Sequence, residues 1–179
     1  MNYVLFEKYH GNGNDFIIID SRDNSYFDDF IDNRSFKIED LCNRNFGIGA
    51  DGIIFILNSD NKENDAKMII YNSDNTEAQM CGNGIRCLVQ YFAEKNLYKK
   101  SYKIETKAGV KIAILENENI SVKMGIPILS KNNIPTTIKT KVNDLYHMNF
   151  SELGLNEIGY AVGMGNPHLI FFLSDIDKL

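Results

Sequence analysis

The sequence has no tryptophan, only three prolines and only three cysteines among its 179 residues. Three is an odd number and no pair of cysteines has the spacing of zinc ligands, so a disulfide framework and a zinc module are both disfavoured. We therefore expect a reducing, cytoplasmic setting. No apolar run approaches the ~20 residues that span a bilayer. The N-terminal stretch carries Glu7 and Lys8 within its apolar run, which is not the layout of a signal peptide.

Blocks of basic residues are also missing. The formal net charge is -5 and no run of Lys or Arg stands out, so we expect neither a nucleic-acid partner nor a membrane partner. With 44% hydrophobic residues, a chain of this length can form one globular domain or two small ones with a substantial core.

The most informative segment is Tyr71–Phe92, in which a polar stretch leads through Cys81-Gly82-Asn83-Gly84 into a strongly apolar helical pattern. The first N–H groups of a helix have no internal partners and carry partial positive charge. This environment favours the thiolate of a cysteine, and the same N–H groups can bind a carboxylate. The alternative is a buried structural cysteine beside a glycine-rich helix start.

The first half of the chain predicts a hairpin, a loop and a helix. Apolar segments at Tyr3–His10 and Phe16–Asp20 flank a Gly/Asn turn and are typical of two strands. The Asp-rich segment Ser21–Asn33 is expected to be a surface loop. A helix is predicted from about Phe36 to Asn45, with Cys42 on its buried face.

Gly47–Gly52 matches the dinucleotide-binding pattern G-x-G-x-x-G. That fingerprint needs a strand before it and a helix after it. Here a helical pattern precedes it and the strand-like Ile53–Leu57 follows, so a nucleotide site is rejected.

The remainder is predicted to be rich in strands, with a domain boundary at Lys107–Gly109. A polar turn at Asn166-Pro167-His168 separates two apolar segments, Gly159–Gly165 and Leu169–Leu173. Further strands are expected at Ala66–Tyr71, Tyr102–Thr106, Val110–Leu115 and Ile120–Met124.

Three kinds of protein are compatible with a cysteine at a helix start. A cysteine hydrolase would pair Cys81 with a histidine such as His168, but no spacing singles that pair out. A structural or binding domain would use Cys81 as core. In the third, the thiolate is a general base that removes the α-proton of an amino acid.

Four motifs favour the third interpretation, because together and in this order they resemble the diaminopimelate epimerase family across essentially the whole chain. They are KYHGNGNDF (Lys8–Phe16), NFGIGADG (Asn45–Gly52), YNSDNTEAQMCGNGIRC (Tyr71–Cys87) and GNPH (Gly165–His168). The resemblance implies an α+β fold of two similar domains, each a strand-rich layer wrapped around a central helix. We expect the first domain at 1–107 and an incomplete second domain at 108–179.

The resemblance also implies an isomerase that interconverts LL- and meso-2,6-diaminopimelate, without a cofactor or a metal, for lysine and peptidoglycan precursor synthesis. Cys81 would be one of two catalytic cysteines on opposite faces of the α-carbon. Gly82 and Asn83 would hold the α-carboxylate. Further substrate contacts are expected from Asn14, Asn72 and Asn166, with His168 as support for the site. The expected partners are a small amino-acid substrate and, as one assembly, a second copy in a homodimer.

Two features depart from the family pattern. Gly52 stands where relatives carry Gln, so a contact from that position is in doubt. The second CG-[ST]-G motif and the Glu-Arg pair before it do not occur in these 179 residues, whose end falls within the expected second domain. Neither Cys42 nor Cys87 can replace the second base, because Cys87 lies about 120° around the helix from Cys81. We therefore expect that these 179 residues alone do not catalyse epimerisation. The alternatives are a truncated, non-catalytic relative and a proline-racemase-like isomerase.

Overall fold

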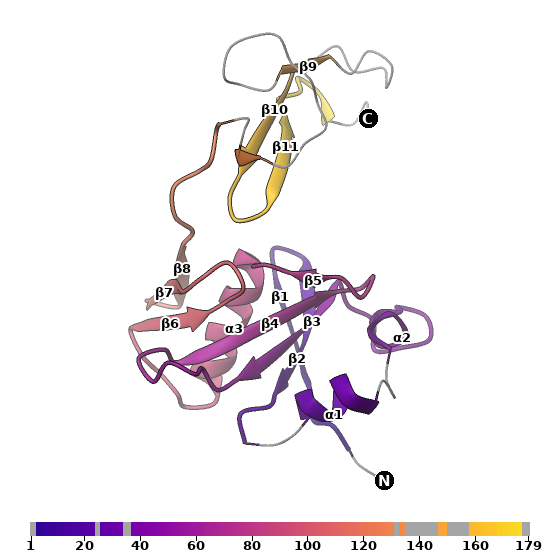
Figure 1. Cartoon of the computed structure of the whole chain (residues 1–179), viewed down its shortest axis with the longest axis vertical. Coiled ribbons are helices and arrows are strands. Elements are labelled where there is room, and N and C mark those ends of the chain that lie inside the picture. The colour runs from indigo at the N-terminus through magenta and orange to yellow at the C-terminus, as the bar shows by residue number, and fades with distance from the viewer. Residues whose placement is uncertain are drawn as a thin grey trace. The chain divides into compact units, whose positions relative to one another are not determined.

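The computed structural model describes residues 3–23, 26–33, 37–130, 133–134, 147–149 and 158–176. Its internal contacts divide the chain into two units, Met1–Met124 and Gly125–Leu179 (Figure 1). This division differs from the boundary expected at Lys107–Gly109, which lies inside unit 1. The reason is that the two strands after that point continue the sheet of unit 1.

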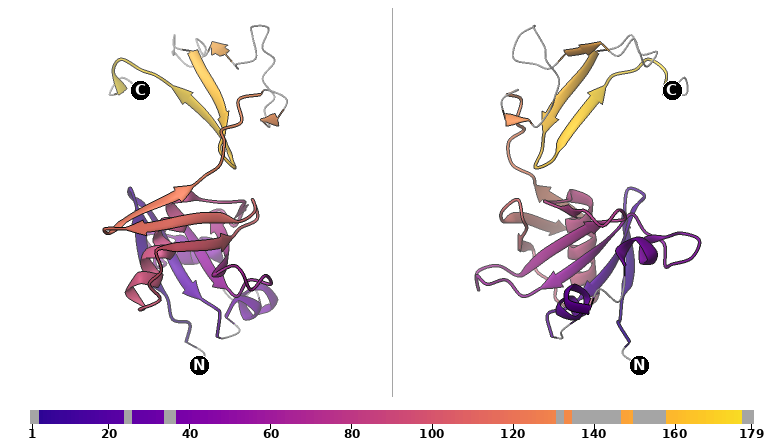
Figure 2. Two further views of the ribbon diagram at one scale, coloured as in Figure 1. Left: turned by 90° about the vertical axis from the view of Figure 1, so that its left-hand side faces the viewer. Right: turned by 45° about the vertical axis from the view of Figure 1, so that its right-hand side comes forward.

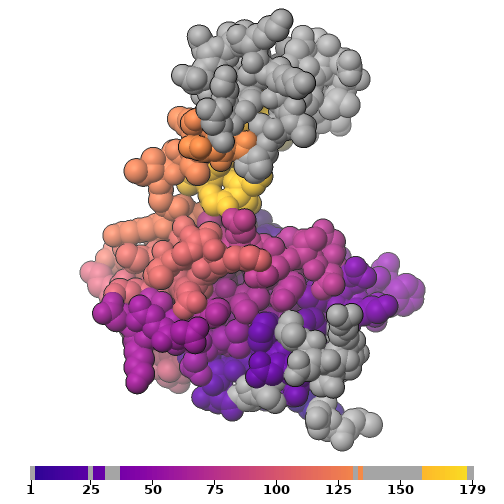
Figure 3. All heavy atoms as spheres, in the orientation of Figure 1, coloured from indigo at the N-terminus to yellow at the C-terminus, as the bar shows by residue number. Residues whose placement is uncertain are grey.

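Unit 1 is built on an eight-stranded sheet with the order β1-β2-β3-β4-β6-β7-β8, in which β5 pairs with β4. The pairs β2–β3 and β4–β6 are parallel and the other neighbours are antiparallel. The strands are β1 (Glu7–Gly11), β2 (Asn14–Asp20), β3 (Gly52–Leu57), β4 (Ala66–Asn72), β5 (Glu77–Ala78), β6 (Ser101–Glu105), β7 (Lys111–Glu116) and β8 (Asn119–Lys123). The space-filling view of unit 1 shows indigo, magenta and orange-pink atoms side by side, so segments far apart in the sequence are neighbours in space (Figure 3).

The inner face of this sheet wraps around helix α3 (Gly82–Glu94), as Figure 2 shows. Alternate strand residues such as Ile54 and Ile104 point to this face and are fully buried with Leu88 and Phe92 of the helix. A helix that is apolar around most of its circumference needs such enclosure. The predicted strand-wrapped central helix is confirmed.

The outer face carries two short helices, α1 (Tyr26–Asn33) and α2 (Ile38–Cys42). The surface loop expected over Ser21–Asn33 is therefore wrong for its second half. Three aromatic side chains of α1 pack against the outer face although the segment is rich in Asp: Tyr26, Phe27 and Phe30. α2 is also shorter than the helix expected to run from about Phe36 to Asn45.

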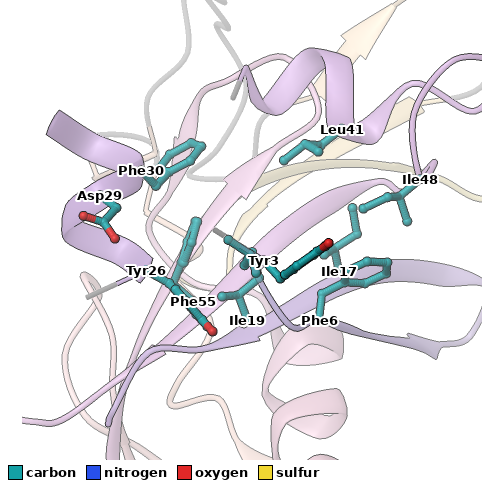
Figure 4. Close-up of a pocket in the computed structure, with 11 residues that line it drawn as sticks. Tyr3, Phe6, Ile17, Ile19, Tyr26, Asp29, Phe30, Leu41, Ile48 and Phe55 are labelled. Carbon is teal, nitrogen blue, oxygen red and sulfur yellow. The ribbon is translucent and has the colours of Figure 1, made fainter. Parts of the chain in front are cut away.

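An apolar pocket of about 290 Å³ opens on this outer face (Figure 4). Strand β2 contributes Ile17 and Ile19 to its lining, and Phe30 of α1 and Leu41 of α2 close over it. The outer face is thus not completely filled.

Unit 2 contains a three-stranded antiparallel sheet in the order β11-β10-β9. Its strands are β9 (His147–Asn149), β10 (Ile158–Gly163) and β11 (Pro167–Phe171). The turn lies at 164–166, where Met164 N donates to Asn166 O at 2.9 Å. The turn expected at Asn166–His168 is therefore shifted, because Pro167 and His168 already pair with β10. Most of the polar segment 131–149 lies outside the described residues.

Within the described part of the chain, no helix is both long and apolar enough to cross a membrane. The same residues contain no group of three or more His, Cys, Asp or Glu side chains that could hold a metal ion.

Candidate active site at the start of the central helix

Cys81 is the N-cap of α3. Its backbone is extended, with φ -142° and ψ 119°, and its carbonyl accepts the first helical hydrogen bond from Ile85 N at 3.0 Å. Gly84 N donates to the half-buried Cys81 Sγ at 3.5 Å, so the sulfur takes the place of the usual capping oxygen. The N–H groups of Gly82 and Asn83 come before that first bond and have no acceptor inside the helix.

The glycine at position 84 lets this helix start lie directly on the sheet. A Cβ at Gly84 would lie 3.0 Å from Ile54 Cδ1 and 3.3 Å from Ile70 Cδ1. A larger residue would require these side chains or the start of α3 to shift by a few tenths of an ångström. The thiol is thus held in place by the packed inner face of the sheet.

Asn14, the first residue of β2, brings the hairpin into contact with this helix start. Its Oδ1 lies 3.8 Å from Cys81 Sγ and accepts from Asn83 Nδ2 at 3.3 Å. Asn83 Oδ1 in turn accepts from Arg86 Nη2 at 2.5 Å. Three residues that sequence analysis predicted for one site, Asn14, Cys81 and Asn83, therefore lie together.

Asn14 adjoins a cluster of charged residues through its contact with Asp51. The cluster consists of Lys8, Asp15, Arg44 and Asp51. Arg44 forms ion pairs with Asp15 at 2.7 Å and with Asp51 at 2.8 Å, and Lys8 approaches Asp15 at 3.0 Å. The hydrogen bonds from Arg44, and then those from Lys8, hold the pKa of Asp15 well below its usual range. Sequence reasoning missed this cluster, although three of its members lie within the motifs Lys8–Phe16 and Asn45–Gly52.

Asn72 lies at the end of β4 and is exposed. Its Nδ2 donates to Thr76 Oγ1 at 2.9 Å, which closes the turn that leads towards β5. Asn166 and His168 belong to unit 2, where Asn166 Oδ1 lies 2.9 Å from His168 Nε2. The two therefore form a local pair beside the turn between β10 and β11.

Cys42 and Cys87 are core residues, as predicted. Their exposed fractions are 4% and 3%, and burial raises the pKa of both thiols, that of Cys87 to about 11. The glycine-rich segment Gly47–Gly52 runs from α2 into β3, which confirms the rejection of a dinucleotide loop. At its end, a Cβ on Gly52 would lie 2.4 Å from Tyr71 O, so the chain has no room for a side chain there.

This chain is similar to known sequences along most of its length. A family model described as diaminopimelate epimerase matches residues 6–129. Proteins named diaminopimelate epimerase from Prochlorococcus marinus (strain NATL2A), Gloeothece citriformis and Carboxydothermus hydrogenoformans are 50%, 42% and 41% identical to this chain over 97–98% of its length. The matched segment is 62% of each relative, so the chain spans less than two-thirds of the length of these proteins.

Solved structures share the fold at low sequence identity. A hydroxyproline epimerase from Agrobacterium vitis superposes with a TM-score of 0.60 at 12% identity, over 93% of this chain and 50% of its own. A probable proline racemase from Agrobacterium radiobacter K84 gives 0.62 at 13% identity, over 94% and 52%. The match to the family model and the identity to the named relatives together show that the chain belongs to the diaminopimelate epimerase family.

Proposed function

We propose that this chain carries one of the two acid–base groups of an amino-acid epimerase that interconverts LL- and meso-2,6-diaminopimelate. The observation that carries the proposal is the half-buried thiol of Cys81 at the start of α3. It lies between Asn14 Oδ1 at 3.8 Å and Gly84 N at 3.5 Å, in a member of this family. A proton-transfer role is supported because this thiol lies beside backbone N–H groups that can hold an anion.

The reaction is a two-base proton transfer without a cofactor. The thiolate on one face removes the α-proton, so that an S–H bond forms and the C–H electron pair moves towards the carboxylate. A thiol on the opposite face then gives its proton to the α-carbon, which inverts the configuration. The free N–H groups of Gly82 and Asn83 would stabilise the negative charge that develops on the carboxylate.

The remaining assignments belong to the same proposal. Asn14, Asn72 and Asn166 would contact the substrate, since an amide both donates to carboxylates and accepts from ammonium groups. His168 would support the site through its contact with Asn166. We further propose a cytoplasmic enzyme of lysine and peptidoglycan precursor synthesis that can assemble as a homodimer.

The test is a chimera in which these 179 residues replace the matching segment of the Prochlorococcus marinus relative, with which they are 50% identical. The relative supplies the rest of its own length, including the expected opposite base. We expect the chimera to convert LL- to meso-diaminopimelate and the Cys81→Ala chimera to lose that conversion by at least about 10³-fold, the scale of losing a catalytic acid–base group.

Cys87→Ala is the matched control, because Cys87 lies on the same helix but is buried in the core. It should retain inversion. A folded Cys81→Ala chimera that still inverts the α-carbon, or a folded unmutated chimera without activity towards diaminopimelate, would contradict the proposal. The 179 residues without the remainder of the relative should give no net inversion, because they hold only one of the two bases.

A further inference from the structure

A chain of hydrogen bonds runs past Cys81 from a guanidinium to a carboxylate. Arg86 Nη2 donates to Asn83 Oδ1 at 2.5 Å, and Asn83 Nδ2 donates to Asn14 Oδ1 at 3.3 Å. Asn14 Nδ2 then donates to Asp51 Oδ2 at 3.1 Å. Cys81 Sγ lies 3.8 Å from Asn14 Oδ1, so the thiol contacts the middle of this chain.

The two ends of the chain fix its direction. A guanidinium can only donate hydrogen bonds and a carboxylate can only accept them, whereas an amide can do both and can be turned over. With Arg86 at one end and Asp51 at the other, both amides in between satisfy their partners in only one orientation. In that orientation the oxygen of Asn14, and not its nitrogen, faces the thiol.

Asp51 is itself held firmly. Its Oδ2 accepts from Asp15 N at 3.0 Å, and its Oδ1 accepts from Arg44 Nη2 at 2.8 Å. The backbones of the two segments are also joined, since Asp51 N donates to Asp15 O at 2.9 Å. The acceptor for Asn14 Nδ2 is therefore anchored on both sides.

We propose that Asp51 is a positioning residue that holds the Asn14 amide with Oδ1 towards Cys81, which makes Asn14 a hydrogen-bond acceptor in the site. This oxygen accepts from the Cys81 thiol, an interaction that only the protonated cysteine can make. With substrate bound, the same oxygen would accept from the ammonium group of an amino acid. That second role rests on the proposed function, whereas the orientation does not.

The orientation has a measurable effect on thiol reactivity, because the thiolate is the form that alkylating reagents attack. If the Asn14 amide turned over, its Nδ2 would donate to the sulfur and favour the thiolate. The charges around Cys81 also affect the reactivity of its thiol. The charged or titratable side chains near it are Lys8, Asp15, Arg44, Asp51, Arg86 and Cys87. The experiment must therefore separate the removal of a charge from the release of the amide.

Two variants of Asp51 make this separation, each made and compared with Asp60→Asn in an Arg86→Ala background, because Arg86 would otherwise fix Asn83 and, through Asn83 Nδ2, keep Asn14 Oδ1 in place. Asp51→Ala removes the charge and the acceptor, whereas Asp51→Asn removes the charge but keeps an oxygen that can accept from Asn14. The control is Asp60→Asn, because the Asp60 side chain is 98% exposed and lies 4.0 Å from Lys67. The readout is the pH profile of Cys81 alkylation by iodoacetamide in the 179-residue chain, followed by mass spectrometry of the peptide that contains Cys81.

We expect Asp51→Ala to move the profile to lower pH and to raise the rate at pH 7 roughly fivefold, the scale of one hydrogen bond gained or lost. Asp51→Asn should give a clearly smaller change, and Asp60→Asn should give none. An unchanged profile in Asp51→Ala would overturn the proposal. Equal changes in Asp51→Ala and Asp51→Asn would also overturn it, because charge alone would then explain them.

A second measurement needs no substitution at Asp51 and covers the case in which Asp51→Ala does not fold. The Asn14 side-chain NH₂ protons in the unmutated chain should exchange with solvent at least roughly tenfold more slowly than those of exposed Asn45, because they donate to Asp51. Equal exchange rates would overturn the proposal. Neither experiment uses diaminopimelate, so failure of the proposed function and failure of this inference are distinguishable.

Discussion

On strand β3, Ile54 points to the inner face of the sheet and packs beside α3, whereas its neighbour Ile53 points to the outer face beneath α1 and α2. Both side chains are fully buried, so the strand is apolar on both sides. The partners differ. The inner face packs against one helix of 13 residues and leaves a pocket of about 400 Å³ where α3 meets β1 and β8. The outer face is covered by helices of 8 and 5 residues and keeps an apolar pocket of about 290 Å³.

The two faces also differ in their relation to the site. The start of α3, with Cys81, is positioned by contacts to the inner face, because Gly84 lies against Ile54 and Ile70. A displacement of a few tenths of an ångström on that face would move the thiol relative to Asn14. Among the hydrogen bonds of the described residues, none joins the outer face to Cys81 or Asn83. A gap in the packing of the outer face therefore need not move these two residues.

The largest expected effect compares equal truncations on the two faces. Ile54→Ala should lower the free energy of unfolding by about 4 kcal/mol, because a closed core is left with a cavity. Ile17→Ala should cost only about 2 kcal/mol, since Ile17 already lines the outer pocket and the space it leaves joins it. Urea denaturation of both variants measures the difference. Equal losses would break the proposed contrast between the faces.

A smaller effect is expected where β3 and β4 meet. Gly52→Ala should lower the free energy of unfolding by about 2–3 kcal/mol, because the added Cβ would lie 2.4 Å from Tyr71 O and must push the strands apart. A suitable comparison is Ala78→Gly in the two-residue strand β5, which removes a methyl group without creating a clash. Thermal melts that place Gly52→Ala at or above the unmutated chain would contradict this explanation of the glycine.

The smallest expected effect is a pH dependence specific to Cys87 on the inner face. Burial raises the pKa of its thiol to about 11, whereas a thiol in the unfolded chain ionises near pH 8.5. Between these values the unfolded state holds fewer protons, so stability falls as pH rises, by up to about 1.4 kcal/mol for each pH unit. Denaturation from pH 8 to 11 should show a steeper fall in the unmutated chain than in Cys87→Ala, which keeps only the contribution of buried Cys42 among the thiols. The same slope in both would assign it to other groups.

Local patterns predicted the elements of unit 1 well. The strand at Ile53–Leu57 and the helix after Cys81 are both confirmed, because an apolar strand and a broadly apolar helix each signal burial. The segment at Tyr26–Asn33 was predicted wrongly, since its Asp residues obscured aromatic residues that recur at helical spacing.

The site was predictable only in part. Motifs placed Asn14, Cys81 and Asn83 together, but nothing in the local sequence showed that Asp51 contacts Asn14. That contact depends on the parallel pairing of β2 with β3, which sets Phe16 opposite Gly52 and so brings Asn14, the first residue of β2, close to Asp51, the residue before β3. The pairing joins segments separated by more than 30 residues, and short-range periodicity contains no information about it.

The most direct test of the two-base proposal follows deuterium in the chimera during conversion of LL-diaminopimelate in D₂O. With Cys81 and a second base on opposite faces, the first meso product should carry solvent deuterium at the inverted carbon while the remaining LL substrate keeps its protium. The Cys81→Ala chimera should give no deuterated meso product. Early deuterium in the recovered LL substrate at the same level as in the product would indicate a single base that exchanges with solvent, and would contradict the two-base account.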